Sequence, residues 1–147
     1  MRVLLFDVAA GRIRFTLRGH SGPIDAVSFS PDGKTLASGG QDTVIHVWDA
    51  LNGIQRQALA GHQAPIRTLT FSPDGQLIAS GGEDTRIILW DAASGTISKI
   101  LSGSTGAINA LIFDPKGRFL VSAADTGEIS IWNVASGMKM LTFTVPI

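Results

Sequence analysis

Histidine, serine and aspartate recur together along the chain, and these are the three side-chain types of a hydrolytic triad. The first set is His20, Ser38 and Asp42, and each member returns 42 residues later. In a hydrolase the histidine would take the serine proton while the aspartate orients the imidazole. A catalytic centre needs one such constellation, together with a substrate cleft and donors for the oxyanion. Because the trio occurs twice at the same offsets, we interpret it as structural and expect no catalytic residue.

Two other patterns in the sequence resemble sites for a phosphate or a metal ion. Gly33-Lys34-Thr35 matches the end of a phosphate-binding loop, but Ser28 stands where that loop needs a glycine and a strand follows instead of a helix. The chain has three histidines and no cysteine. His20 and His62 occupy equivalent places in different repeats, and His46 has no second ligand at a useful spacing. We therefore expect no metal ion and no cofactor.

All of these residues belong to a 42-residue repeat that extends along the whole chain. Its most visible members are Trp48, Trp90 and Trp132, which stand 42 residues apart. The same spacing places Phe6-Asp7 in register with Trp48-Asp49. A period of about 40 to 45 residues is typical of one blade of a β-propeller.

Each repeat contains four short apolar runs that are separated by turn residues. In the first complete repeat the runs cover residues 24–30, 35–38, 44–48 and 54–59. Pro31-Asp32-Gly33 separates the first two runs, with a proline that presets φ and a glycine that accepts a left-handed conformation. We found no convincing helical period. The pattern predicts an all-β fold of four-stranded antiparallel blades.

The repeated motifs resemble those of the WD40 repeat family. The motifs of the first complete repeat are Gly19-His20, Ser30-Pro31-Asp32-Gly33, Asp42 and Trp48-Asp49. They recur at fixed offsets in the second repeat and more loosely in the third, so the resemblance covers essentially the whole chain. It implies a β-propeller segment and a role in binding other proteins.

This resemblance divides the chain into half a blade and three blades. Residues 1–18 correspond to the outer two strands of a blade, and the full blades are 19–60, 61–102 and the degenerate 103–147. About 3.5 blades are not enough to close a ring alone, because propellers have about four to eight blades. An open arc would leave two apolar blade faces in water. We expect closure by homo-oligomerisation, or by further blades of a longer parent chain. A two-fold dimer would combine six full blades with two thin positions.

The resemblance also implies a hydrogen-bond network within each blade, formed by a histidine, a serine, an aspartate and a tryptophan. Its members would be His20, Ser38, Asp42 and Trp48 in one blade, and His62, Ser80, Asp84 and Trp90 in the next. Such a network satisfies buried imidazole, carboxylate, hydroxyl and indole groups together. The last blade keeps Ser122 and Trp132 but has Ser104 and Thr126 in place of histidine and aspartate. We expect this network to be missing and the blade to be the least stable.

One rim of the propeller is the expected binding surface. Its candidate positions lie where first strands begin and where second strands turn into third strands: Pro23, Asp25, Gln41, Pro65, Arg67, Glu83, Ala107, Asn109 and Asp125. They vary between repeats while the scaffold motifs persist, as a recognition surface requires. Free drift of exposed positions would produce the same variation, so the sequence leaves both explanations open.

Composition narrows the class of partner. The 147 residues include 12 basic and 12 acidic side chains, so the positive footprint of a nucleic-acid-binding protein is absent. The apolar run 3–6 is too short for a signal-peptide core, and no run reaches the length of a membrane-spanning helix. We expect a non-catalytic scaffold in the cytoplasm that binds a protein or peptide, without nucleic acid or membrane. The alternatives are a segment that only completes a larger propeller, and a hydrolase that uses the first triad.

Overall fold

The computed structural model describes residues 1–146, which form 14 strands in four antiparallel sheets and no helix. Ile147, the last residue of the predicted third blade, lies outside the described residues. The half sheet consists of β1 (Arg2–Asp7) and β2 (Arg12–Arg18). The prediction of an all-β fold is confirmed.

The other three sheets have four strands each, and every strand pairs with its neighbour in the chain. The first sheet contains β3 (Ile24–Phe29), β4 (Thr35–Gly40), β5 (Val44–Asp49) and β6 (Gln55–Ala60). The second sheet contains β7 (Ile66–Phe71), β8 (Leu77–Gly82), β9 (Ile87–Asp91) and β10 (Ile97–Leu101). The third sheet contains β11 (Ile108–Phe113), β12 (Phe119–Ala124), β13 (Glu128–Asn133) and β14 (Lys139–Thr144).

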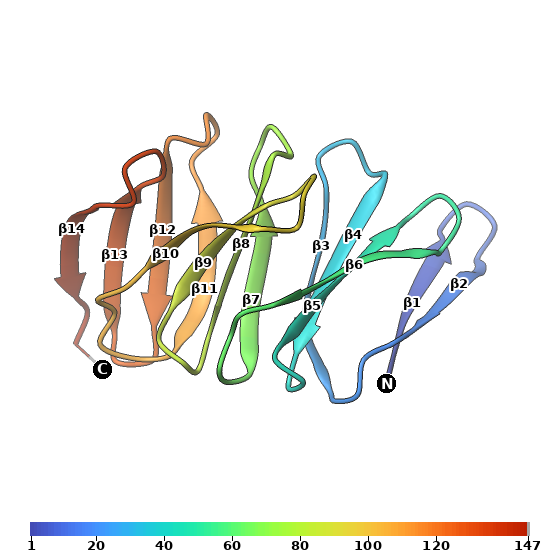
Figure 1. Ribbon diagram of the computed structural model, residues 1–147, viewed down its shortest axis with the longest axis horizontal. Helices are drawn as coiled ribbons and strands as arrows, with labels where there is room; N and C mark the ends of the chain where they lie inside the picture. The colour runs from blue at the N-terminus through green and yellow to red at the C-terminus, as the bar shows by residue number, and fades with distance from the viewer. Residues whose placement is uncertain (147) are drawn as a thin grey trace.

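The four sheets stand side by side in a row (Figure 1). The half sheet lies at one end and the third sheet at the other, so β1 and β14 are far apart in the row. No sheet of the described residues closes on itself. The structure is therefore a partial propeller, as the sequence predicts. Residues 1–146 include no helix long and apolar enough to cross a membrane.

Local turn chemistry fixes the hairpins. Between β3 and β4 the Ser30 amide donates to the Thr35 carbonyl at 2.8 Å, and Gly33 adopts a left-handed φ of 70°. The Asp32 carboxylate accepts hydrogen bonds from the Ser30 hydroxyl at 2.6 Å and from the Lys34 amide at 3.0 Å. The Ser-Pro-Asp-Gly sequence thus ends one strand and starts the next without help from distant residues.

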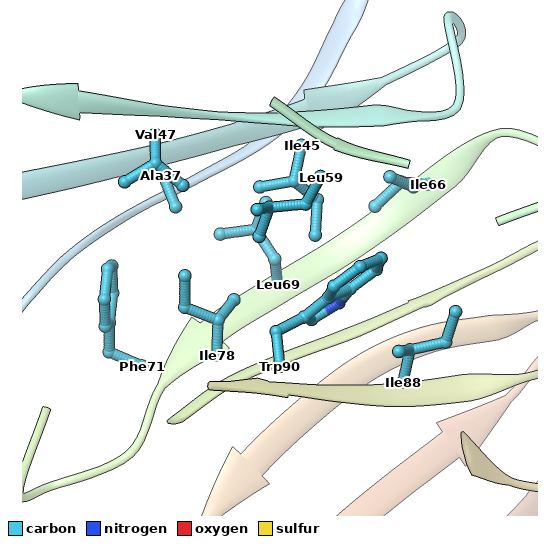
Figure 2. Packing of buried hydrophobic residues seen from close by; sticks show 10 residues of the cluster. All are labelled: Ala37, Ile45, Val47, Leu59, Ile66, Leu69, Phe71, Ile78, Ile88 and Trp90. Atoms are coloured by element: carbon cyan, nitrogen blue, oxygen red, sulfur yellow. The ribbon is translucent and has the colours of Figure 1, made fainter. Parts of the chain in front are cut away.

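The hydrophobic core lies between the sheets. Ile45, Val47 and Leu59 of the first sheet point towards Ile78 and Trp90 of the second sheet (Figure 2). Equivalent clusters lie between the second and third sheets and between the half sheet and the first sheet. Because both faces of a middle sheet are covered, its inner strands are apolar on both sides. This explains the low content of charged residues, 16% of the chain.

Candidate functional site

The first sheet brings His20, Ser38, Asp42 and Trp48 together in one chain of hydrogen bonds. His20 precedes β3, Ser38 lies on β4, Asp42 lies in the following turn and Trp48 lies on β5. His20 Nδ1 is 2.7 Å from Asp42 Oδ2, and His20 Nε2 is 2.7 Å from Ser38 Oγ. Trp48 Nε1 donates to the same Ser38 oxygen at 2.9 Å. With the proton on Nδ1, the imidazole donates to the carboxylate and accepts from the hydroxyl, so every group is satisfied.

The second sheet repeats this geometry. His62 Nδ1 is 2.8 Å from Asp84 Oδ2, His62 Nε2 is 2.7 Å from Ser80 Oγ, and Trp90 Nε1 donates to that hydroxyl oxygen at 2.8 Å. Ser38 and Ser80 are both 0% exposed. A nucleophile must reach its substrate, so the burial of both hydroxyls favours the structural interpretation over the hydrolase.

Protonation is expected to weaken the second network in two steps as the pH falls. Burial lowers the pKa of His62 below its ordinary value of 6.5. Burial alone would raise the pKa of Asp84, but hydrogen bonds from the Gln63 amide and from His62 outweigh it, so this pKa lies below 3.8. In both cases the unfolded chain takes up its proton at a higher pH than the folded chain. The free energy of unfolding should therefore decrease below pH 6.5 and again below pH 3.8.

Urea unfolding at a series of pH values, followed by circular dichroism, measures this dependence. His62→Gln removes the titrating imidazole, and should make the dependence between about pH 5 and 6.5 shallower than in the wild type. A free energy of unfolding that increases on acidification through this range would contradict the assignment.

The third sheet keeps part of the network. Trp132 Nε1 donates to Ser122 Oγ at 2.9 Å. Ser104 instead donates to the Gly106 carbonyl at 3.1 Å, and Thr126 contacts Thr105 at 3.0 Å. The indole–hydroxyl bond therefore remains, while the bridge from imidazole to carboxylate has no counterpart among the described residues.

The third sheet has a different buried carboxylate, Glu128, beside Thr105, and it could not be recognised from the sequence motifs. Glu128, at the start of β13, is 6% exposed. It accepts hydrogen bonds from Thr105 Oγ1 at 3.0 Å and Ser130 Oγ at 3.3 Å, and lies 3.5 Å from Lys139 Nζ. Burial alone would raise the pKa of Glu128, but the Thr105 hydroxyl and the Lys139 charge outweigh it and lower the pKa below 4.5. The signal in the sequence was a glutamate where the earlier repeats have Val44 and Arg86.

The serine hydroxyls of the second and third sheets provide a matched test of the networks. Ser80→Ala removes the partner of both His62 and Trp90, whereas Ser122→Ala removes the partner of Trp132. We expect losses of about 2 and about 1 kcal/mol in the free energy of unfolding, because each buried group left without a partner costs about 1 to 3 kcal/mol. If urea unfolding showed equal losses in the free energy of unfolding for the two variants, the serine of the second sheet would have no greater role than that of the third sheet.

At the predicted rim, one arginine connects two sheets. Arg67 Nη2 donates to Glu83 Oε1 at 3.0 Å within the second sheet. Its other amino nitrogen, Nη1, donates to Asn109 Oδ1 of the third sheet at 2.8 Å and lies 3.7 Å from Asp125 Oδ2. We call these four residues the rim cluster. Because three side chains from two sheets contact one guanidinium, its position is restrained before any partner binds.

The remaining rim candidates have mixed roles. Asp25 accepts a hydrogen bond from Gln41 Nε2 at 2.7 Å, and both side chains are exposed. The carbonyls of Pro23 and Pro65 each accept a backbone amide from the turn between β4 and β5, or between β8 and β9, at 2.9 Å. Ala107 is 8% exposed, so its side chain offers almost no surface and leaves the candidate set. The Ala107 backbone amide donates a hydrogen bond to Asp125 Oδ1 at 3.0 Å, which connects the segment before β11 to the turn after β12.

His46 is closer to potential ligands than the sequence suggested. His46 Nε2 lies 3.8 Å from Asp42 Oδ2, and the rings of His46 and His20 are 4.1 Å apart. The expectation that His46 has no second ligand nearby is wrong. The pleat places His46 and Trp48 on the same face of β5, and that face lies against the network. Burial lowers the pKa of His46, and the neighbouring His20 adds to the effect.

Comparison with known proteins assigns the repeat. A family model described as WD domain, G-beta repeat, matches residues 11–49, 53–91 and 95–133. Each matched segment starts just before the outer strand of one sheet and ends with the third strand of the next sheet. One repeat of the family therefore contributes its first strand to one sheet and its other three strands to the next sheet.

Individual relatives match about one repeat each. The chain is 44% identical over 48 residues to Protein HIRA of Oryza sativa subsp. japonica, and 52% identical over 42 residues to Small ribosomal subunit protein RACK1 of Medicago sativa. It is 45% identical over 51 residues to WD repeat-containing protein SL1-17 of Schistosoma mansoni. These matches cover 33%, 29% and 35% of the chain. They cover 5%, 13% and 17% of the relatives, so the chain spans a small part of their length.

Proposed function

Because the chain belongs to the WD40 repeat family, we propose that it is a non-catalytic scaffold that presents one rim of its sheets to a protein or peptide. The observation that carries this proposal is the rim cluster. Its arginine is held by side chains from two sheets, at positions that differ between otherwise similar repeats. Preorganised side chains lose little conformational freedom on binding, and arginine is common among residues that dominate protein interfaces.

The buried network residues support the proposal that the chain is not catalytic. The serine, histidine and tryptophan of each complete network are buried, and their polar atoms already have partners within the sheet. Chemistry on a substrate needs groups that reach it, whereas these groups connect strands. In this proposal the network residues stabilise the sheets, and the rim residues bind the partner.

Mixed charge at the rim favours protein recognition over nucleic acid or lipid. Arg67 lies beside Glu83 and Asp125, and the whole chain has a formal net charge of 0. Binding to nucleic acid or to an anionic membrane is driven by clustered positive charge. We also propose a cytoplasmic location, which is supported by the similarity to a relative that is named a small ribosomal subunit protein.

Two triple variants at opposite edges of the sheets test the scaffold proposal. The rim variant carries Arg67→Ala, Glu83→Ala and Asp125→Ala. The control carries alanine at Lys34, Gln76 and Arg118, exposed residues at equivalent places in the turns between first and second strands. A partner captured with the wild-type chain is purified and titrated against both variants, and its affinity should fall at least tenfold for the rim variant alone.

A stability control completes the experiment, because the rim cluster also connects two sheets. Both triple variants should retain the near-ultraviolet circular dichroism of the buried tryptophans. Unchanged affinity of a folded rim variant would overturn the proposal. It would favour the second candidate, a segment whose role is to complete a larger propeller.

Exposed apolar side chains near the two ends of the row support that second candidate. Val27 and Phe29 are 55% and 52% exposed, whereas the equivalent Leu69 and Phe71 are 6% and 7% exposed. The latter pair is covered by the inner strands of the first sheet, and the half sheet has no inner strands. At the other end, Phe143 is 46% exposed. Apolar patches of this kind mark surfaces that another protein element covers.

A further inference from the structure

Three side chains of the first sheet that could bind a metal ion lie in one group beside the turn between β4 and β5. His46 has no histidine counterpart in the other sheets, which have Ile88 and Ser130 at that position. Its ring lies 4.1 Å from that of His20 and stacks at 5.7 Å on Trp48. This side chain therefore adds an imidazole to a pair that already contains an imidazole and a carboxylate.

The three ligand atoms have the separations of a metal site. One ligand atom from each of His20, Asp42 and His46 lies within 4.8 Å of the other two. Asp42 Oδ2 is 2.7 Å from His20 Nδ1 and 3.8 Å from His46 Nε2. Bonds of about 2.0 to 2.2 Å to a tetrahedral Zn²⁺ ion require ligand atoms roughly 3.3 Å apart. The two observed distances lie on either side of that value, so small side-chain rotations would bring the atoms into place.

Neighbouring side chains hold both imidazoles in position. Ser38 Oγ lies 2.7 Å from His20 Nε2, and Gln55 Nε2 lies 2.9 Å from His46 Nδ1. A half-turn of the Gln55 amide exchanges its nitrogen and oxygen, so that Nδ1–H of His46 donates to the oxygen and Nε2 keeps its lone pair. Histidine ligands of metals commonly donate their second ring N–H in this way. Binding of an ion at Nδ1 requires the tautomer of His20 that carries its one ring proton on Nε2, so this proton would move from Nδ1 to Nε2 and Nε2–H would then donate to Ser38 Oγ.

From this geometry we propose that His20, Asp42 and His46 bind one divalent transition-metal ion such as Zn²⁺, with water as the fourth ligand. Two imidazoles and one carboxylate are a set of nitrogen and oxygen donors that suits Zn²⁺. The ion would connect the segment before β3 with the turn between β4 and β5 and with β5 itself. It would thereby stabilise the first sheet next to the half sheet.

The second sheet supplies an internal control for the site. His62 and Asp84 repeat the imidazole–carboxylate pair at 2.8 Å, but Ile88 replaces the second imidazole. Two ligands bind an ion much more weakly than three. The complete chain should therefore bind one ion, although it contains two histidine–aspartate pairs.

Titration of the complete chain with ZnCl₂ by calorimetry, and with CoCl₂ by visible absorption, tests the proposal. We expect one ion per chain and the intense visible bands of tetrahedral Co²⁺. His46→Ile copies the residue of the second sheet and should weaken binding at least tenfold. Asp42→Asn should do the same, whereas Asp84→Asn changes the equivalent network in the second sheet and should leave the affinity unchanged.

The site would be overturned by no binding to the wild type, by two ions per chain, or by unchanged affinity in His46→Ile. The paired aspartate variants separate ligand loss from general destabilisation, because both change one network of the same geometry. Equal loss of affinity in the two variants would also reject the site. Melting temperatures measured with and without ZnCl₂ give a second readout, since an ion that binds the folded chain must raise the wild-type value.

Discussion

Replacing Trp90 with alanine is expected to lower the free energy of unfolding by about 4 kcal/mol. The Trp90 side chain is 1% exposed and lies in the cluster between the first and second sheets (Figure 2). Alanine would leave a cavity in that cluster and would also remove the indole N–H that donates to Ser80 at 2.8 Å. Since a domain is typically stable by about 5 to 15 kcal/mol, this loss would remove between about a quarter and four fifths of that stability.

Urea unfolding followed by far-ultraviolet circular dichroism measures this loss without relying on tryptophan fluorescence. Trp90→Phe keeps much of the buried volume but removes the indole donor, so it should cost less than the alanine variant. Val8→Ala changes a side chain that is 92% exposed and should stay within about 0.5 kcal/mol of the wild type. A cost of about 1 kcal/mol or less for Trp90→Ala would show that contacts between sheets do not dominate the stability.

Strands and hairpins could be predicted from the sequence because their determinants are local. Asp32 and Gly33 set the turn between β3 and β4 through neighbours two or three residues away. The alternation of apolar residues then gives each strand its faces. The repeat added long-range information, since equivalent residues must occupy equivalent places in successive sheets. These two sources are sufficient to place the four strands of each sheet.

Contacts between unrelated positions could not be predicted in the same way. The approach of His46 to Asp42 depends on which face of β5 meets the loop before β3, and periodicity alone does not show this. The bond from Arg67 to Asn109 crosses from one sheet to the next and depends on the distance between the sheets. Glu128 could not be predicted because the two earlier repeats have Val44 and Arg86 at its position. Side chains that depart from the repeat therefore carry the information that the repeat cannot supply.

At the open end of the third sheet, side chains are larger than their equivalents in the middle of the row. A Cβ added to Gly81 would lie 2.6 Å from Ile108 Cγ2 of the next sheet, yet the third sheet has Ala123 at that position. Val121 likewise replaces Ala79, and Phe143 replaces Leu101. A further sheet like the three complete ones would place an isoleucine against Ala123. The half sheet of a second copy has no first strand and therefore no such isoleucine.

The isolated chain is accordingly expected to self-associate in solution, with the half sheet of one copy against the third sheet of another. Leu4 and Phe6 of the half sheet, which are 41% and 59% exposed, would cover Leu141 and Phe143. Light scattering should report a mass of at least twice 15.5 kDa. The double variant Leu141→Lys and Phe143→Lys should shift the protein to a folded monomer, because each contact would bury an ammonium group without a partner.

Leu51→Lys is the matched control for this experiment, because Leu51 is 53% exposed and Leu141 is 54% exposed, but Leu51 lies in the loop between β5 and β6. This variant should keep the mass of the wild type. A wild-type chain that stays monomeric at high concentration would show that the apolar ends tolerate water. Association that both lysine variants retain would place the contact elsewhere on the surface.

A twofold arrangement also requires both ends to be covered at once, so Phe6→Lys should release the monomer as fully as the double variant does.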